Sequence, residues 1–363
     1  MDVDSFELEG GKNIPLTLAY ETYGNLNNAR NNVVLICHSL THSSHVAKHC
    51  EDDKKGWWGD MVGPGKYIDT NKYFVICINI PGSCYGSTGP SSINPDTGEE
   101  YGLDFPKISI RDMVRSQKLV IDKLHINQIK SVIGASIGGQ QTLEWSKRYP
   151  SLVKSIVPIA TGARVSPLML GFGCISQNAI RSDPYWNGGS YYGTKHTPKF
   201  GLKIARQIGH LTYLSRDSIE EKFGREKVEE QKNNETNDFK IESYLDYQGE
   251  KFIDRFDPNS YLYITDAMHR YDLSKGYSND IEAVENFNGL ANIISIDSDW
   301  HFTVDESEYL SNVFEEAGNF VIHDVIKSKY GHDAFLIETD KLGRKIELFL
   351  RYMFKGEFVT DIN

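Results

Sequence analysis

The chain has 363 residues, of which 39% are hydrophobic and 25% are charged, and its formal net charge is −11. This length predicts one large domain with an insertion, or two domains. The composition supports a sizeable core, which excludes a wholly disordered chain and a small disulfide-stapled protein. The acidic balance argues against nonspecific binding to nucleic acid or to a membrane surface.

The lack of a recognisable targeting signal and the cysteine usage are both typical of a cytoplasmic protein. No run of residues approaches the 18 apolar residues of a transmembrane helix, and the acidic N-terminus lacks the pattern of a signal peptide. The five cysteines show no CxxC spacing, so we expect free thiols at Cys37, Cys50, Cys77, Cys84 and Cys174. These features predict a cytoplasmic protein with neither nucleic acid nor membrane among its partners.

Short β-branched runs predict buried strands, in chain order at residues 33–37, 73–79, 131–133, 155–159, 293–296 and 320–326. Helical patterns cover residues 111–124 and 138–148, and Pro150 ends the second of them. Strands that alternate with helices predict a mostly parallel sheet with helices on both faces, which is an α/β fold.

The alternation of predicted strands and helices stops in the middle of the chain. Helical patterns without strands lie there, at residues 176–181, 202–214, 241–256 and 260–269. Within this part, residues 216–237 are densely charged, which predicts an exposed, mobile loop. We therefore expect an α/β core formed by residues 1–162 and 287–363, interrupted by a helical cap of residues 163–286.

A G-x-S-x-G motif of Gly134, Ser136 and Gly138 lies between a predicted strand and a predicted helix. The turn at such a serine is too tight for side chains two residues away on either side, which accounts for the glycines. It projects the serine hydroxyl above the sheet at a helix N-terminus, where free N–H groups stabilise an oxyanion. We interpret Ser136 as a nucleophile; the alternative is a glycine-rich turn with a bystander serine.

A nucleophilic serine needs a histidine base and an acid that orients the base. In α/β-hydrolase cores the acid and then the histidine follow the serine along the chain. His332 follows the last predicted strand and is our candidate base. Asp297 and Asp299 both follow the preceding strand, and Asp299, which is deeper in the loop, is our candidate acid. A cap or turn role is the alternative for either carboxylate.

Two backbone N–H groups must bind the oxyanion of such a reaction. We expect one from Ile137, directly after the serine, and the other from Leu40, in the loop after the strand at residues 33–37.

The loop after that first strand also holds five potential metal ligands, namely His38, His42, His45, His49 and Cys50. Histidines four residues apart can bind a metal on a helix, but this segment is predicted to be a loop. No acid or CxxC within it completes a set. We therefore expect no metal site, and interpret these side chains as lining a pocket or lying on the surface.

Longer blocks resemble the homoserine O-acetyltransferase family of α/β-hydrolase-fold enzymes. They are residues 56–70 (GWWGDMVGPGKYIDT), 84–95 (CYGSTGPSSINP), 101–106 (YGLDFP), 111–114 (RDMV), 183–189 (DPYWNGG) and 330–335 (YGHDAF). The resemblance covers nearly the whole chain, and together these blocks are far more specific than the serine motif.

The resemblance implies transfer of an acetyl group from the co-substrate acetyl-CoA to the hydroxyl of L-homoserine, an early step of methionine synthesis. It implies a triad of Ser136, Asp299 and His332, and amino-acid binding by Arg206 and Asp333. The guanidinium of Arg206 can donate two parallel hydrogen bonds to the carboxylate of an amino acid, and the carboxylate of Asp333, beside the base, can bind its ammonium group. The alternatives are a surface salt bridge for Arg206 and a loop cap for Asp333. The family also implies a homodimer that meets through the cap helices.

We expect a ping-pong reaction, with the cap forming a narrow tunnel over the serine that excludes water. Three positions depart from the family pattern, namely residues 80–84, Ile137 and His42, so serine as acceptor and succinyl-CoA as donor stay open. Two further functions stay open as well: an esterase or thioesterase, with water as acceptor, and a non-enzymatic binding module. The sequence contains no P-loop and no G-x-G-x-x-G that opens a βαβ unit, so no bound cofactor is expected.

Overall fold

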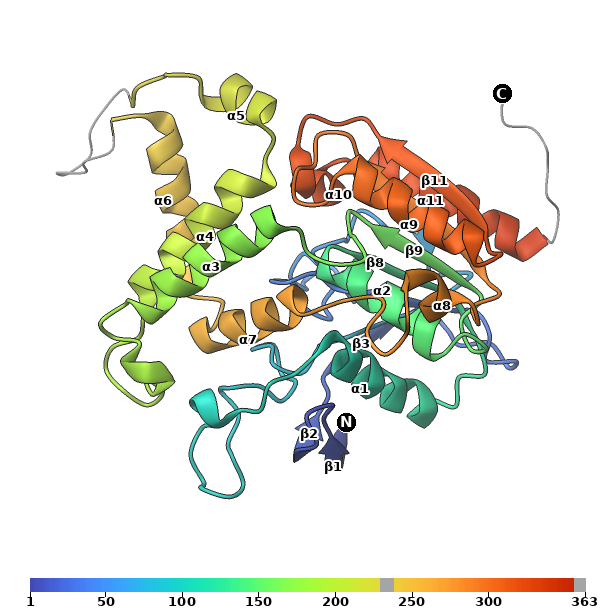
Figure 1. The fold of residues 1–363 in the computed structure, drawn as a ribbon, viewed down its shortest axis with the longest axis horizontal. Coiled ribbons are helices and arrows are strands. Elements are labelled where there is room, and N and C mark those ends of the chain that lie inside the picture. The colour runs from blue at the N-terminus through green and yellow to red at the C-terminus, as the bar shows by residue number, and fades with distance from the viewer. Residues whose placement is uncertain (229–237, 356–363) are drawn as a thin grey trace.

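The computed structural model describes residues 1–228 and 238–355. Its centre is a seven-stranded sheet in the order β11-β10-β9-β8-β4-β7-β3 (Figure 1). Adjacent strands run parallel except at one edge, where β3 is antiparallel to β7. The strands of this sheet are β3 (Tyr20–Tyr23), β4 (Val33–Cys37), β7 (Phe74–Ile78), β8 (Ile129–Ala135), β9 (Ser155–Ile159), β10 (Leu290–Ile296) and β11 (Phe320–Ile326). The prediction of a mostly parallel sheet is confirmed.

The two faces of the sheet belong to two separate cores. Odd-numbered residues of β4 lie in one core and even-numbered residues in the other, because successive side chains of a strand point to opposite faces. Helices cover both faces, as predicted. One face packs against α1 (Ile110–Lys123), α2 (Ile137–Arg148) and α9 (Val304–Glu316), and the other against α11 (Thr339–Lys355).

A group of helices follows β9 and stands to one side of the sheet (Figure 1). It consists of α3 (Pro167–Arg181), α4 (Lys199–Tyr213), α5 (Arg216–Phe223), α6 (Lys240–Ile253) and α7 (Pro258–His269). Helix α4 packs against both α3 and α6, and α3 also contacts α7. The short helix α8 (Asp280–Val284) instead packs against α2 and α9, so the chain has returned to the core by that point. We call helices α3 to α7 the cap helices.

The prediction of a loop at residues 216–237 is wrong for the first part of this segment, which forms α5. The Ser215 side chain caps this helix by accepting a hydrogen bond from the Ser218 N–H, and Asp217 lies in the first turn, where a negative charge is favourable. A dense run of charges is therefore compatible with a short helix on the surface. Residues 229–237 lie outside the described part of the chain.

Several further elements were not predicted, among them α11, although its buried residues Leu342, Ile346, Phe349 and Leu350 have helical spacing. Besides β3, α8, α9 and α11, they are β1 (Asp2–Glu7), β2 (Asn13–Thr17), β5 (Val62–Gly63), β6 (Ile68–Asp69), α10 (Ala334–Ile337), η1 (Gly102–Asp104), η2 (Asn187–Gly189) and η3 (Gly331–Asp333). Among the helices of the described residues, none combines the length and the apolar character needed to cross a membrane.

Substitution of Trp145 tests how strongly this side chain anchors α2 to the core. It is fully buried, and its indole N–H donates to Gln117 of α1 at 2.7 Å. We expect Trp145→Ala to lower the free energy of unfolding by about 3–5 kcal/mol, because it leaves a large cavity and an unpaired amide oxygen. Urea denaturation measures this. Leu348→Ala, at a side chain that is 48% exposed, is the control and should change stability by less than about 0.5 kcal/mol. Equal losses in the two variants would contradict the prediction.

Candidate active site

Ser136 lies at a sharp turn between β8 and α2, with φ 59° and ψ −124°. A serine rarely adopts a positive φ, and such strain persists only where the surroundings impose it. Here the Ser136 N–H donates to Ile159 O at 3.0 Å, and Thr161 Oγ1 donates to Ser136 O at 2.9 Å. The end of β9 and the residues that follow it therefore hold the strained turn in place.

The glycines on either side of Ser136 lie where no side chain fits. A Cβ on Gly134 would come within 2.2 Å of Gly138 O, and a Cβ on Gly138 within 2.2 Å of Cys37 O. Both obstacles are backbone atoms, so neither can move aside cheaply. The glycines thus allow the end of β4, the end of β8 and the start of α2 to meet, as the tight turn of the motif predicts.

The histidine and the acid pair directly. His332 Nδ1 lies 2.7 Å from Asp299 Oδ2, and both side chains are buried. The other oxygen, Asp299 Oδ1, accepts hydrogen bonds from the N–H groups of His301 at 2.8 Å and Phe302 at 3.3 Å. The carboxylate is therefore fixed, and it holds the proton on Nδ1. This leaves Nε2 of His332 as the atom able to take a proton.

The structure also separates the two candidate acids. Asp297 accepts a hydrogen bond from the backbone N–H of Ser328 at 2.9 Å and caps a loop, whereas Asp299 contacts the histidine. Burial lowers the pKa of His332, but the charge and hydrogen bond of Asp299, with the charge of Asp333, outweigh burial. The pKa of His332 therefore lies above its ordinary value of 6.5.

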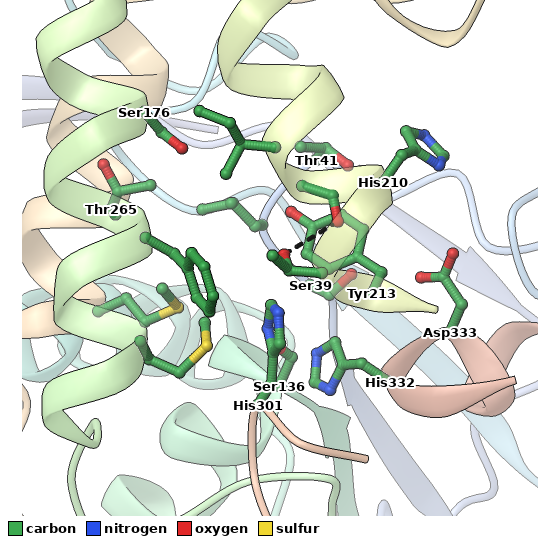
Figure 2. A pocket seen from close by; sticks show the side chains of 18 of the residues that line it. Ser39, Thr41, Ser136, Ser176, His210, Tyr213, Thr265, His301, His332 and Asp333 are labelled. Atoms are coloured by element: carbon green, nitrogen blue, oxygen red, sulfur yellow. Dashed lines mark hydrogen bonds between the residues drawn. The ribbon is translucent and has the colours of Figure 1, made fainter. Parts of the chain in front are cut away.

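Ser136 and His332 line one cavity of about 220 Å³ (Figure 2). The core supplies the triad side of this pocket, and the cap helices supply the opposite wall. The cap residues of that wall include Met169, Phe172, Ser176, Arg206, Tyr213, Thr265 and Met268. Ser136 is only 8% exposed, so the cap helices cover the reacting atom.

The two proposed oxyanion donors flank the serine from different elements. Leu40 lines the pocket from the loop after β4, and Ile137 is the first residue of α2. Among the described residues, neither backbone N–H has a hydrogen-bond partner. Both groups are therefore free to bind a negative oxygen.

The two proposed substrate-binding residues reach the same pocket. The Nε of Arg206, on α4, is buried without a hydrogen-bond partner in the described chain, and its guanidinium lies 4.7 Å from the ring centre of Phe252 and 6.0 Å from that of Tyr213. Asp333 is half-buried beside the base (Figure 2). Burial raises the pKa of Asp333, an effect that the charges of His332 and Arg206 partly offset. The pocket thus contains a guanidinium whose Nε has no hydrogen-bond partner among the described residues, together with a carboxylate.

One pocket residue was missed by the sequence analysis. The His301 ring stacks on His332 with 5.0 Å between ring centres, and its Nε2 is buried without a partner among the described residues (Figure 2). Burial and the charge of His332 lower the pKa of His301 well below 6.5, so its ring is neutral. The signal in the sequence was its position two residues after the acid, in a loop already assigned to the site.

The five potential metal ligands of the loop after β4 do not come together. His38 is buried and accepts a hydrogen bond from the Ile80 N–H at 3.2 Å, while His42 lines the pocket and contacts the Ser39 hydroxyl. Cys50 is exposed. The remaining two, His45 and His49, lie beside Glu21 of β3.

Comparisons with known proteins agree with this architecture. A family model described as the alpha/beta hydrolase fold matches residues 32–339. The homoserine O-acetyltransferase of Natronomonas pharaonis is 46% identical, with 98% of this chain and 92% of that protein covered. The homoserine O-acetyltransferase of Haloferax volcanii is 44% identical, with 99% and 90% covered.

Two solved structures give the same result in three dimensions. Homoserine O-acetyltransferase from Bacillus anthracis is 30% identical, with 96% of each chain covered and a TM-score of 0.90. Esterase E22 is 27% identical, with 96% of this chain and 98% of that chain covered and a TM-score of 0.88.

The triad geometry predicts how Ser136 reacts with a fluorophosphonate probe. Labelling requires neutral His332, so its rate should fall as the pH drops through a midpoint above 6.5, where His332 becomes protonated. Asp299→Asn removes the charge that raises this pKa, so it should lower the midpoint and slow labelling by roughly 10³- to 10⁴-fold. Mass spectrometry measures the rate, and Ser136→Ala is the unlabelled control. A wild-type midpoint below 6.5 would refute the electrostatic argument.

Proposed function

Because the chain belongs to the homoserine O-acetyltransferase family of α/β-hydrolase-fold enzymes, we propose that it transfers an acetyl group from acetyl-CoA to the hydroxyl of L-homoserine. One observation carries the proposal: the pocket lined by Ser136 and His332, with Asp299 hydrogen-bonded to His332, is also lined by Arg206 and Asp333. A hydrolase needs only the first three groups, because its acceptor is water. An amino-acid acceptor needs two further charges, one for its carboxylate and one for its ammonium.

In the first half-reaction, His332 Nε2 removes the proton of Ser136 Oγ as this oxygen attacks the thioester carbonyl of acetyl-CoA. The amides of Leu40 and Ile137 bind the oxyanion. The C–S bond then breaks, His332 returns the proton to the sulfur, and CoA leaves as a thiol. Asp299 keeps the imidazole in the correct tautomer and stabilises the imidazolium that forms. An acetyl ester remains on the serine.

In the second half-reaction, homoserine takes the place of CoA. His332 removes the proton of its hydroxyl, the oxygen attacks the acetyl ester, and the serine leaves and regains the proton. Arg206 binds the substrate carboxylate with a bidentate geometry, and Asp333 holds the ammonium. Water competes for the same ester, so the cover that the cap helices provide over Ser136 favours transfer over hydrolysis. One nucleophile used twice gives a ping-pong order.

The remaining parts of the proposal follow from the family. The product enters methionine synthesis in the cytoplasm, and no bound cofactor is needed beyond the co-substrate acetyl-CoA. The five free thiols support a reducing compartment. A homodimer through the cap helices is supported by large apolar side chains that α3 and α4 leave exposed, at Leu168, Leu170, Ile175, Phe200 and Leu211.

Acetyl-ester hydrolysis is the second candidate. It is favoured by the likeness to esterase E22, since the same Ser–His–Asp set can pass its acetyl group to water. The charged groups on the amino-acid side of the pocket would then have no role, which is why we place transfer first.

Free-thiol release from acetyl-CoA distinguishes the two activities. We expect release by the purified protein to require L-homoserine, and Ser136→Ala to lower kcat by roughly 10⁴-fold or more. Equal release without homoserine would establish hydrolysis instead. Succinyl-CoA and L-serine, tested in separate arms, rank donor and acceptor. Near-wild-type turnover by Ser136→Ala would overturn the mechanism.

Arg206 tests recognition of the amino acid. Arg206→Lys keeps the positive charge but cannot make two parallel hydrogen bonds to a carboxylate. We therefore expect kcat/KM for homoserine to fall roughly 30-fold or more, which is a loss of about 2 kcal/mol in transition-state stabilisation. Hydrolysis of a small neutral acetate ester by the same variant should change by less than about threefold, because that substrate has no carboxylate. Arg216→Lys, at an exposed position of α5, is the matched control. A parallel loss on both substrates would assign Arg206 a purely structural role.

A further inference from the structure

A second cluster of polar side chains lies outside the pocket, where the loop after β4 meets β3. Glu21, His45 and His49 each offer one ligand atom, and these three atoms all lie within 4.8 Å of one another. Glu21 Oε2 is 3.0 Å from His45 Nδ1 and 2.8 Å from His49 Nε2. We propose that this cluster is a binding site for a divalent transition-metal ion, with Zn²⁺ as the ion that suits it best.

The donor set determines the class of ion. Two imidazole nitrogens and one carboxylate oxygen suit zinc, whereas Ca²⁺ and Mg²⁺ prefer oxygen ligands throughout. Zinc ligands lie about 2.0–2.2 Å from the metal, which separates the ligand atoms of a tetrahedral site by about 3.4 Å. The observed separations of 2.8 and 3.0 Å therefore need to widen by only a few tenths of an ångström. The fourth position is left to water.

The contact on the far side of His45 supports the same conclusion. Its Nε2 lies 2.8 Å from the backbone oxygen of Lys54, to which it can only donate a proton. A neutral ring therefore presents the bare lone pair of Nδ1 to Glu21 Oε2, and two acceptors at 3.0 Å repel each other. A proton between these atoms makes a hydrogen-bonded ion pair, and a metal ion that replaced this proton would contact the same two atoms. A histidine that ligates a metal through one nitrogen commonly donates its other N–H to a backbone carbonyl in this way.

Neighbouring side chains hold the ligands in place before any ion binds. The Tyr23 hydroxyl donates to Glu21 Oε2 at 2.7 Å and accepts a hydrogen bond from the Val46 N–H at 3.0 Å. The Tyr23 ring stacks on His49 with 4.6 Å between ring centres and an interplanar angle of 7°. One tyrosine thus orients both the carboxylate and an imidazole, which lowers the conformational entropy lost on binding.

The cluster is open to solvent, since its side chains are 28% exposed at Glu21, 23% at His45 and 47% at His49. An ion can enter without any change in the core. The same loop carries Leu40 and other residues that line the pocket, so a bound ion would fasten that loop to β3. We assign the site a stabilising role and no part in the acyl transfer.

Protons compete with the metal for the two histidines. Burial lowers the pKa of His45, but the Lys54 carbonyl, Glu21 and Asp53 outweigh burial and raise it. His49 and Tyr23 also contact Glu21, and the thiol of Cys77, which pairs with Glu21 across β3 and β7, interacts with its charge. A metal ion binds neutral imidazoles and must displace the protons that compete for them, so affinity should fall as the pH is lowered.

Titration of the full chain with Zn²⁺ by isothermal calorimetry at pH 7.5, after removal of metals with a chelator, tests the proposal. We expect one equivalent to bind, and Co²⁺ in place of Zn²⁺ to give the visible absorption bands of a tetrahedral site. His49→Ala should weaken binding at least tenfold, and so should Glu21→Gln, which keeps the size of the side chain. His196→Ala removes an exposed histidine of another region and is the matched control.

Thermal melting in the absence of metal establishes that each variant folds. The proposal would be overturned if the wild-type protein bound no Zn²⁺. It would also be overturned if His49→Ala and Glu21→Gln bound Zn²⁺ as tightly as the wild-type protein does. An equal loss in His196→Ala would mean nonspecific binding to surface histidines, and would also overturn it. The measurement uses neither acetyl-CoA nor homoserine, so its outcome is independent of the proposed activity.

Discussion

The close approach of three backbone segments around Ser136 is the constraint on which the site depends. The ends of β4 and β8 and the start of α2 come so near that Gly134 and Gly138 have no room for a Cβ. This packing forces the serine to a positive φ and directs its side chain away from the sheet. The same approach brings the loop after β4, which carries Leu40, to the pocket lined by the serine. The position of Ser136 and the position of the loop after β4 thus depend on the same packing.

The pocket divides its work between two parts of the fold. The core supplies the groups that make and break bonds, and the cap helices supply Arg206 and the cover over the serine. The solved acetyltransferase and esterase structures each match 96% of this chain, so the likeness extends over both the core and the cap helices.

Sequence reasoning identified the parts of this site whose signals are local or follow a fixed chain order. Ser136 was identified by a short motif between a strand and a helix, and Asp299 and His332 by their order after it, whereas Arg206 was found only through family resemblance. Reasoning from the residues failed where the relevant contact is distant in sequence or where composition misled. Glu21 meets His45 only because β3 pairs with β7 at the sheet edge, which spacing within the loop cannot reveal. Charge density hid α5, because a solvent-facing helix and a loop share that composition.

The order of the site along the chain has a consequence for synthesis on the ribosome. Ser136 directly follows β8, whereas Asp299 and His332 follow β10 and β11, after the whole cap has been made. A nascent chain that has completed its first half therefore carries a serine hydroxyl with no base to activate it. Domains fold as their residues emerge, and contacts between distant segments form late. The last folding steps are thus also the steps that bring His332 and Asp299 to Ser136, so an incomplete or truncated chain lacks the assembled set of three side chains.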